Sequence, residues 1–286
     1  MNGNNEHNFK RIRDACDALG ITGPKLENVL NIVQSYIPKG DEDTQLPDEL
    51  LTGFAPIDYL LGPMKCNLRI HIYGRASSAK TSIIAHTIHS ATNIHNVQAL
   101  WLDSTHKLNA KFFRKFGIID KLNFLQKSEL TPAIIDMIKS EKYRIIVLDD
   151  IASFMHESLG LLERLLFYCK RNRIMVLAAN QVREKPGTGM VYASRQQLLT
   201  SYDATLKSSK YKIHYEQEYS DYDLKLEYHH SNGKMEGKNI IIPITNQGYV
   251  KHDLMDKRIA KIVTTEGYST LTEYLKDRQH ESNKAI

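Results

Sequence analysis

The stretch 69–82, RIHIYGRASSAKTS, limits the fold of this chain more than any other part of it. A β-branched run leads into a turn at Gly74, the turn ends in Lys80 and Thr81, and an apolar helical pattern follows over 83–88. Strand, loop and helix in this order are the setting of a phosphate-binding loop, where backbone N–H groups and the helix N-terminus attract phosphate oxygens. The simpler alternative is a strand–helix turn that only happens to carry a lysine.

The predicted loop supplies a complete set of candidate nucleotide-binding residues. They are Gly74, Arg75, Ala76, Ser77, Ser78, Ala79, Lys80, Thr81 and Ser82. Lys80 would reach the terminal phosphates, and the Thr81 hydroxyl would bind Mg²⁺. The spacing G-x-x-x-x-A-K-T puts Ala79 where the usual pattern has glycine. An alanine is harmless there at negative φ but costs roughly 1–2 kcal/mol at positive φ.

Composition places the chain among ordinary globular proteins. Its 286 residues are 42% hydrophobic and 25% charged with a net charge of +5, which permits nucleic-acid binding without requiring it. The three scattered cysteines favour neither a zinc site nor a disulfide framework. We expect no membrane span, because no apolar run reaches about eighteen residues. The polar N-terminus predicts a soluble intracellular protein, located in the nucleus of a eukaryote and otherwise in the cytoplasm.

Four segments can be distinguished along the chain. Residues 1–36 predict two short helices around a glycine-rich turn, a pair that resembles the helix-hairpin-helix module and would bind either DNA phosphates or a protein surface. Residues 37–50 have the Pro, Gly and acidic composition of a linker. Residues 51–251 would form the core. Residues 252–286 predict one or two amphipathic helices and a polar tail.

Apolar runs and helical patterns alternate within the core. The runs are 69–73, 98–102 and 144–148, and the helical patterns between and around them are 81–92, 108–116 and 130–141. This alternation predicts an α/β fold with a parallel sheet that has helices on both faces. From Ser209 onward, shorter alternating stretches predict an antiparallel extension of the sheet.

Polar residues stand at the ends of the predicted strands. They are Asp103, Asp149, Asn180 and Gln181. Because ligands bind at the carboxyl ends of parallel strands, we expect these residues to meet the phosphate loop at one edge. Asp149 would face Thr81 across Mg²⁺, unless it only caps a helix. Gln181 would sense the γ-phosphate, unless it is a plain residue at a strand end.

The order of these pieces resembles the RecA/RadA recombinase superfamily, most closely its eukaryotic and archaeal paralogs. The similar stretches are T-G-x-x-x-x-D-x-x-L-G at 52–62, the loop and helix at 74–87, the strands at 100–105, 142–150 and 173–182, and the final hairpin at 240–250. The resemblance covers about residues 51–251. It implies a RecA-like, P-loop core that binds ATP and Mg²⁺, with a mostly parallel sheet flanked by helices and a small N-terminal helical segment.

The chain departs from this family at the position of its catalytic glutamate. That glutamate orients and deprotonates the attacking water, and Thr105 stands in its place. Loss of a positioned base typically removes a factor of about 10²–10⁴ in rate, so we expect ATP binding with slow hydrolysis. His106 and Asp150 are near in the sequence and could substitute, although a plain surface role is equally compatible with the sequence.

Two further departures concern DNA binding and self-assembly. The first of the two mobile DNA-binding loops of recombinases would be curtailed to 151–159, before a helix at 160–171. The second is expected at 183–195, where glycine and proline give mobility, cations meet phosphates and an aromatic ring stacks on a base; a solvated loop is the alternative. Its candidate DNA-binding residues are Arg183, Lys185, Tyr192 and Arg195. The linker 37–50 lacks the phenylalanine through which these recombinases polymerise, so long homofilaments are not expected.

Together these features imply a recombinase paralog. Such a protein would bind ATP, join the main recombinase or another paralog in a hetero-oligomer, and assist its loading on single-stranded DNA in homologous recombination repair. One alternative is an active, DNA-dependent strand-exchange ATPase of phage or plasmid type. Another is a different RecA-fold motor, such as a helicase.

Overall fold

The computed structural model describes the chain in ten stretches. They are residues 49–50, 52–62, 64–65, 68–181, 183–185, 189–191, 203–215, 220–228, 237–245 and 247–284. The chain divides into two compact units, 1–45 and 46–286, and every described residue belongs to the second. The helical pair predicted for 1–36 and most of the predicted linker lie outside the described residues.

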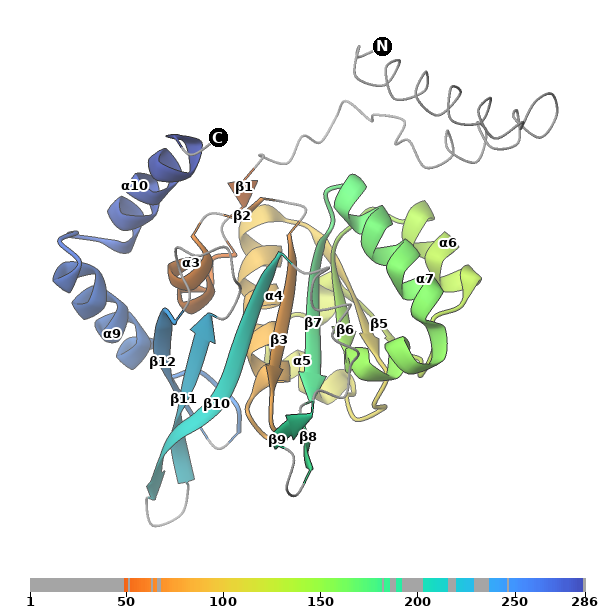
Figure 1. The fold of residues 1–286 in the computed structure, drawn as a ribbon, viewed down its shortest axis with the longest axis horizontal. Coiled ribbons are helices and arrows are strands. Elements are labelled where there is room, and N and C mark those ends of the chain that lie inside the picture. Colours follow the sequence, from red (N-terminus) through yellow and green to blue (C-terminus); the bar gives the residue numbers. More distant parts are fainter. Residues whose placement is uncertain are drawn as a thin grey trace. The chain divides into compact units, whose positions relative to one another are not determined.

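An eight-stranded sheet forms the centre of the second unit, in the order β12-β11-β10-β3-β7-β6-β4-β5 (Figure 1). Its strands are β3 (Arg69–Gly74), β4 (Gln98–Asp103), β5 (Leu122–Gln126), β6 (Tyr143–Asp149), β7 (Met175–Gln181), β10 (Ala204–Tyr215), β11 (Ser220–Tyr228) and β12 (Asn239–Ile244). The pairs from β10 to β5 are parallel, and β11 and β12 are antiparallel to their neighbours. The predicted α/β fold with a mostly parallel sheet is therefore confirmed.

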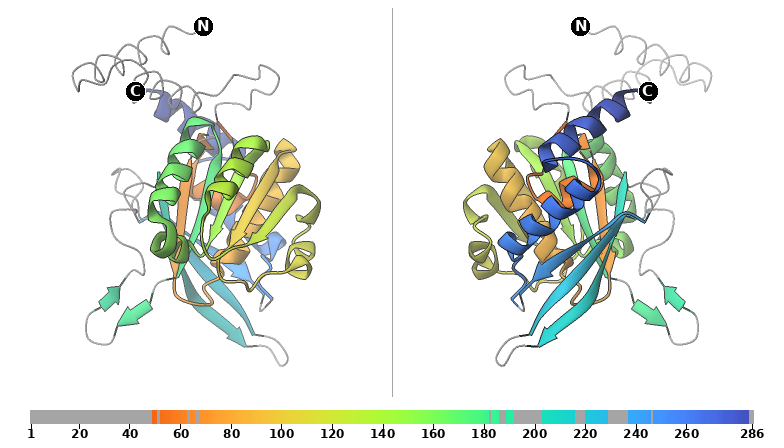
Figure 2. Two further views of the ribbon diagram at one scale, coloured as in Figure 1. Left: turned by 90° about the vertical axis from the view of Figure 1, so that its right-hand side faces the viewer. Right: turned by 90° about the vertical axis from the view of Figure 1, so that its left-hand side faces the viewer.

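Helices cover both faces of the sheet (Figure 2). They are α3 (Ala55–Leu61), α4 (Lys80–His95), α5 (Ala110–Lys115), α6 (Pro132–Ser140), α7 (Ile151–Arg171), α9 (His252–Thr265) and α10 (Leu271–Lys284), with a 3₁₀ turn, η1, at Ile119–Lys121. Side chains of β4 alternate between the two faces: Trp101 packs in the cluster that contains α4, and Leu100 packs in the cluster that contains α6 and α7. Among the described helices, none combines the length and apolar character that crossing a membrane requires.

The segment expected as a curtailed loop, 151–159, is helical instead. Helix α7 starts at Ile151, where Oδ1 of Asp150 caps it by accepting the N–H of Ala152 at 3.1 Å. It bends at Ser158, whose backbone leaves helical geometry and whose hydroxyl contacts both backbone groups of Leu130. The loop prediction was wrong because the apolar spacing of 151, 154 and 155 already belongs to a helix, and all three side chains are buried.

Strand β5 was not predicted from the sequence. It lies at the edge of the sheet and pairs with β4 alone. Of its five residues only Leu122 is buried, so the sequence carries little alternation there. An edge strand with one buried residue gives too weak a hydrophobic pattern for recognition.

Two small two-stranded antiparallel sheets complete the described strands. Strands β1 (Glu49–Leu50) and β2 (Met64–Lys65) pair with each other, and β8 (Arg183–Lys185) pairs with β9 (Gly189–Val191). The second of these sheets belongs to the connection from β7 to β10. Because both strands run parallel to β3, this connection has to return from the carboxyl edge of the sheet to its amino edge.

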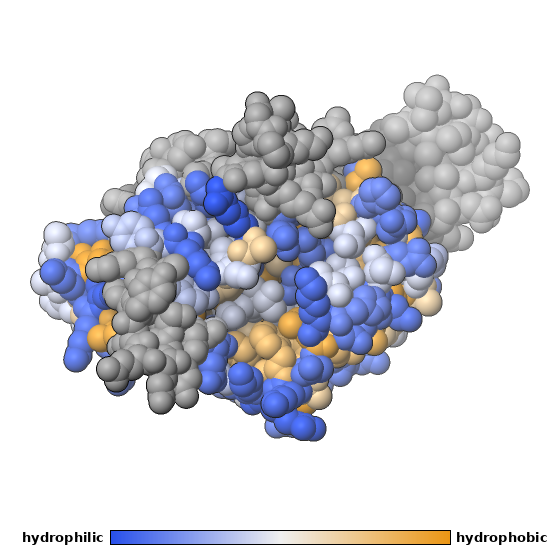
Figure 3. Space-filling model, turned by 90° about the horizontal axis from the view of Figure 1, so that it is seen from below, coloured by the Kyte–Doolittle hydropathy of each residue, from blue (hydrophilic) through white to orange (hydrophobic). Residues whose placement is uncertain are grey.

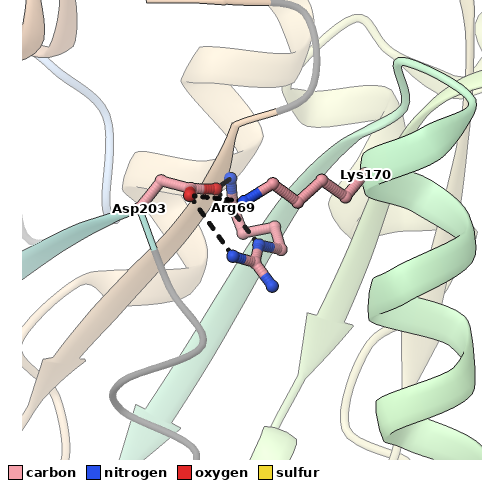
Figure 4. A network of polar contacts seen from close by, with 3 residues as sticks. All are labelled: Arg69, Lys170 and Asp203. Atoms are coloured by element: carbon pink, nitrogen blue, oxygen red, sulfur yellow. Dashed lines mark hydrogen bonds and ion pairs between the residues drawn. The ribbon is translucent and has the colours of Figure 1, made fainter. Parts of the chain in front are cut away.

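An ion-pair network marks the point where that connection returns (Figure 4). Asp203 accepts hydrogen bonds from the backbone N–H of Arg69 at 3.0 Å and from its Nε at 3.1 Å, and lies 3.6 Å from Nζ of Lys170. Burial opposes ionisation, but these bonds and charges hold the pKa of Asp203 below its usual value. The network joins the start of β10 to β3 and to α7.

Candidate nucleotide-binding site

The loop between β3 and α4 surrounds the amine of Lys80. Nζ of Lys80 donates to the carbonyl oxygens of Gly74 at 3.1 Å and Arg75 at 2.8 Å, and lies 3.4 Å from the hydroxyl of Ser78. Burial lowers the pKa of this amine, and the charges of Asp150 and Asp149 act in the opposite direction. The arriving oxygens of a phosphate would compete with these carbonyls for the same hydrogens.

The backbone of Ala79 adopts the left-handed conformation, with φ 54° and ψ 22°. This is the case in which an alanine in place of glycine is strained, and Ser77 has a positive φ of 59° as well. Gly74 cannot be replaced so easily, because a Cβ there would lie 2.1 Å from the carbonyl oxygen of Ser208. Strand β10 thus runs tightly beside the loop, and the Ser208 hydroxyl also bonds the carbonyl of Ser78.

Thr81 and Asp149 face each other across the start of α4. The Thr81 hydroxyl donates to Oδ2 of Asp149 at 3.0 Å. Burial raises the pKa of Asp149 to about 6, and the neighbouring charges of Asp150 and Asp103 add to this. A hydroxyl and a carboxylate placed in this way form an oxygen pair that suits Mg²⁺. Among the described residues no group of three or more His, Cys, Asp or Glu side chains could hold a metal, so a cation here would need ligands from phosphates as well.

A cavity of about 520 Å³ opens beside these residues at the carboxyl edge of the sheet. Figure 3 looks onto this edge and shows a hollow bordered mostly by hydrophilic residues, with more apolar residues on one side. The structure brings Asp149 and Gln181 to the cavity together with the loop from Ala76 to Ser82. Asn180 is buried and is not among the described lining residues.

Several lining residues were not predicted from the sequence as site residues. They are Lys107, Leu108, Phe112, Lys210, Tyr222, Gln247 and Gly248. The last four come from the antiparallel extension, which reaches the cavity only because β10 lies next to β3. No local pattern places these four residues at the cavity.

At the exit of β4, both the N–H and the hydroxyl of Thr105 are used in hydrogen bonds within the turn. The N–H and hydroxyl of Thr105 donate to Oδ1 of Asp103 at 2.9 and 2.7 Å, and the N–H of Leu108 donates to the other oxygen at 3.0 Å. Thr105 lines the cavity, whereas His106 is not among the described lining residues. Asp103 therefore shapes the turn after β4.

The predicted DNA-binding residues are only partly within the described chain. The backbone of Arg183 and Lys185 forms β8, and Tyr192 and Arg195 lie outside the described residues. The described residues therefore do not test the DNA-binding role, which stays a prediction.

The T-G-x-x-x-x-D stretch has a structural role in the described chain. Oδ1 of Asp58 accepts the N–H of Thr52 at 2.8 Å and its hydroxyl at 2.6 Å, and Oδ2 accepts the N–H of Gly53 at 2.8 Å. Burial raises the pKa of Asp58 to about 6 against the effect of these bonds. This closed turn holds the start of α3.

Comparison with known proteins decides the family. Residues 34–201 match the family described as the RecA N-terminal domain, which is more than half of the chain. The chain belongs to the RecA family. The match to RecA ends before β10, so the part of the cavity wall that β10 and β11 form lies beyond it.

Similar proteins include RecA of Frankia alni, 29% identical over 192 residues (57% of this chain and 55% of that protein). RecA of Bifidobacterium breve is 30% identical over 172 residues (52% and 44%). RecA of Mycoplasmopsis pulmonis is 33% identical over 140 residues (41% and 41%). The chain thus spans about half the length of the curated relatives it matches. These relatives are bacterial RecA proteins, and the likeness to eukaryotic and archaeal paralogs stays a prediction.

Proposed function

We propose that this chain binds ATP with Mg²⁺ and acts on single-stranded DNA in homologous recombination. The observation that carries the proposal is the arrangement of Lys80, Thr81 and Asp149 around one cavity at the carboxyl edge of a RecA-like sheet. Membership of the RecA family supports the same assignment.

Each residue has a task in this proposal. The loop N–H groups and Lys80 hold the phosphates, and the start of α4 adds the partial positive charge of a helix N-terminus. Thr81 and Asp149 would hold Mg²⁺, which when bound neutralises charge on the phosphates. Gln181 ends β7 beside the cavity and leads into the segment that contains the predicted DNA-binding residues.

We further propose that the protein is an accessory paralog that works with a main recombinase or another paralog. Thr105 in the glutamate position and the helix at 151–157 in place of a loop both favour a protein that keeps ATP binding and loses part of the recombinase activity. Arg183, Lys185 and Arg195 alone would give a shallow salt dependence, with a slope of about −2 on a single strand, so partners would matter. The alternatives are a working strand-exchange ATPase and a helicase. Strong single-strand-dependent ATP turnover with strand exchange would favour the former, and unwinding the latter.

Replacement of Lys80 by alanine tests nucleotide binding. Loss of a charged donor to phosphate should weaken ATP binding by about 10- to 100-fold, measured by titration calorimetry. Lys111→Ala is the matched control, because Lys111 is an exposed lysine of α5 outside the described cavity lining. Equal ATP affinity of the wild type and Lys80→Ala would contradict the proposed site.

A further inference from the structure

The exits of β4 and β6 lie side by side at the cavity. The two strands pair in parallel register, with Asp103 opposite Asp149. One residue further, the Ser104 hydroxyl donates to the carbonyl of Asp150 at 2.8 Å and accepts its N–H at 2.9 Å. A side chain that leaves β6 at position 150 therefore reaches the same region as one that leaves β4 at position 105, and both Thr105 and Asp150 line the cavity.

The exit of β4 adds no carboxylate to the described lining of the cavity, because the oxygens of Asp103 accept hydrogen bonds from the turn that follows it. The Thr105 hydroxyl donates to Asp103, and His106 is outside the described cavity lining. Among the described residues that line the cavity, the carboxylates are Asp149 and Asp150. Asp149 faces Thr81 and belongs to the proposed cation site, so Asp150 is the second carboxylate of the described lining.

Asp150 is held in a defined orientation at the cavity wall. Its Oδ1 accepts the N–H of Ala152 at 3.1 Å, and its Oδ2 accepts the N–H of Gln181 at 3.3 Å. These donors come from α7 and β7, so two elements fix one side chain.

We propose that Asp150 takes over, from the neighbouring strand, the task of the carboxylate that is missing at Thr105: it orients the attacking water and accepts its proton. This rests on the proposed ATP site. In the step, the water oxygen forms a bond to the γ-phosphorus, and the bond from that phosphorus to the β–γ bridging oxygen breaks. ADP leaves with the electron pair, the water proton goes to the Asp150 carboxylate, and inorganic phosphate is the second product.

The central test is Asp150→Asn, measured for ATP affinity and for phosphate release with single-stranded DNA. Asparagine keeps the size and an oxygen that can cap α7, but it cannot accept a proton. We expect kcat to fall by about 10²- to 10⁴-fold, whereas ATP affinity stays the same or increases because a negative charge has been removed. Asp136→Asn is the control, since that carboxylate is exposed on α6, and it should leave kcat unchanged.

A rescue experiment separates a chemical role from a structural one. Thr105→Glu added to Asp150→Asn puts a carboxylate back at the adjacent strand exit. We expect kcat of the double variant to be at least tenfold higher than kcat of Asp150→Asn. A carboxylate that only holds α7 and β7 together would not be replaced from position 105. The positioning contact is tested by Ser104→Ala, which keeps the Asp150 carboxylate and should lower kcat far less than Asp150→Asn.

Each other outcome overturns the proposal in a recognisable way. Unchanged kcat in Asp150→Asn, or loss of kcat and ATP affinity together without rescue by Thr105→Glu, would mean that Asp150 does not activate water. Tight ATP binding without any turnover by the wild type would overturn the role of Asp150 and leave the nucleotide site standing. Failure of the wild type to bind ATP would overturn the proposed function itself.

Discussion

At the scale of single residues, Ala79 and Asp58 show that a match or a mismatch to a motif does not by itself reveal what the residue does. The sequence marks Ala79 as a departure from a glycine pattern, and only its φ of 54° shows that the departure costs stability. Asp58 belongs to a stretch recognised by its resemblance to recombinases, yet its carboxylate closes a turn with Thr52 and Gly53.

Replacement of Ala79 by glycine should stabilise the protein. Glycine removes the left-handed penalty of roughly 1–2 kcal/mol and loses part of this gain to the larger entropy of the unfolded chain. We expect the free energy of unfolding in urea to rise by about 0.5–1 kcal/mol. Ala260→Gly, at an exposed position inside α9, should instead lower it by about 1 kcal/mol. A decrease in both variants would show that the strain at Ala79 is absent.

At the scale of elements, a buried histidine joins α4 to the turn that follows β12. Nε2 of His86 accepts the N–H of Val250 at 3.1 Å, and its ring stacks on Phe54 with 5.6 Å between centroids. Burial lowers the pKa of His86 to about 4, and the nearby His252 and His89 act in the same direction. The neutral ring is needed because a protonated Nε2 could not accept this bond. The turn held in this way carries Gln247 and Gly248 to the cavity.

His86→Gln tests this link through its dependence on pH. A folded-state pKa below the unfolded value of 6.5 gives stability that is complete above about pH 6.5 and is lost as pH falls toward 4. Between pH 7 and pH 5 the wild type should lose about 2 kcal/mol more unfolding free energy than His86→Gln, whose amide oxygen can accept the same N–H. Comparison of the two proteins removes the opposite contribution of Asp58, whose raised pKa gives stability that is lost as pH rises through about 6. Parallel pH curves in urea denaturation would refute this role of His86.

At the scale of the whole described unit, helices α9 and α10 are joined to α3. Nζ of Lys238, just before β12, lies 3.8 Å from the ring centroid of Tyr59 on α3 and 4.5 Å from that of Tyr274 on α10. Glu266, at the end of α9, accepts the hydroxyl of Tyr59 at 2.7 Å and lies 3.9 Å from the lysine. One cation thus connects four elements that are far apart in the sequence.

Removal of that cation should loosen the C-terminal helices before the sheet. For Lys238→Met we expect about 1–2 kcal/mol less stability, because the cation–π contacts and the ion pair are lost while the apolar stem is kept. Relative to the wild type, amide hydrogen exchange in the variant should become faster in α9 and α10 and stay unchanged in β6. Lys261→Met, at an exposed position on α9, is the control and should change neither. Equal exchange in the two variants would contradict the role of Lys238.

The sequence by itself determined the parts of this protein that depend on local pattern. The strand–loop–helix around Lys80, the alternation of β and α elements and the placement of Asp149 and Gln181 at strand ends could all be predicted, because periodicity and turn residues act over a few positions. The same periodicity could have predicted the helical start of α7. It could not have predicted β5, in which only one residue is buried.

Only the tertiary structure decided what depends on contacts between distant segments. The left-handed backbone of Ala79 is seen only in the structure. The wall that Lys210 and Tyr222 add to the cavity follows from how β10 packs beside β3. Asp150 lies beside the exit of β4 because β6 pairs with β4 in register. Strand order is set by the burial of whole faces of the sheet, a property that no short stretch of sequence contains.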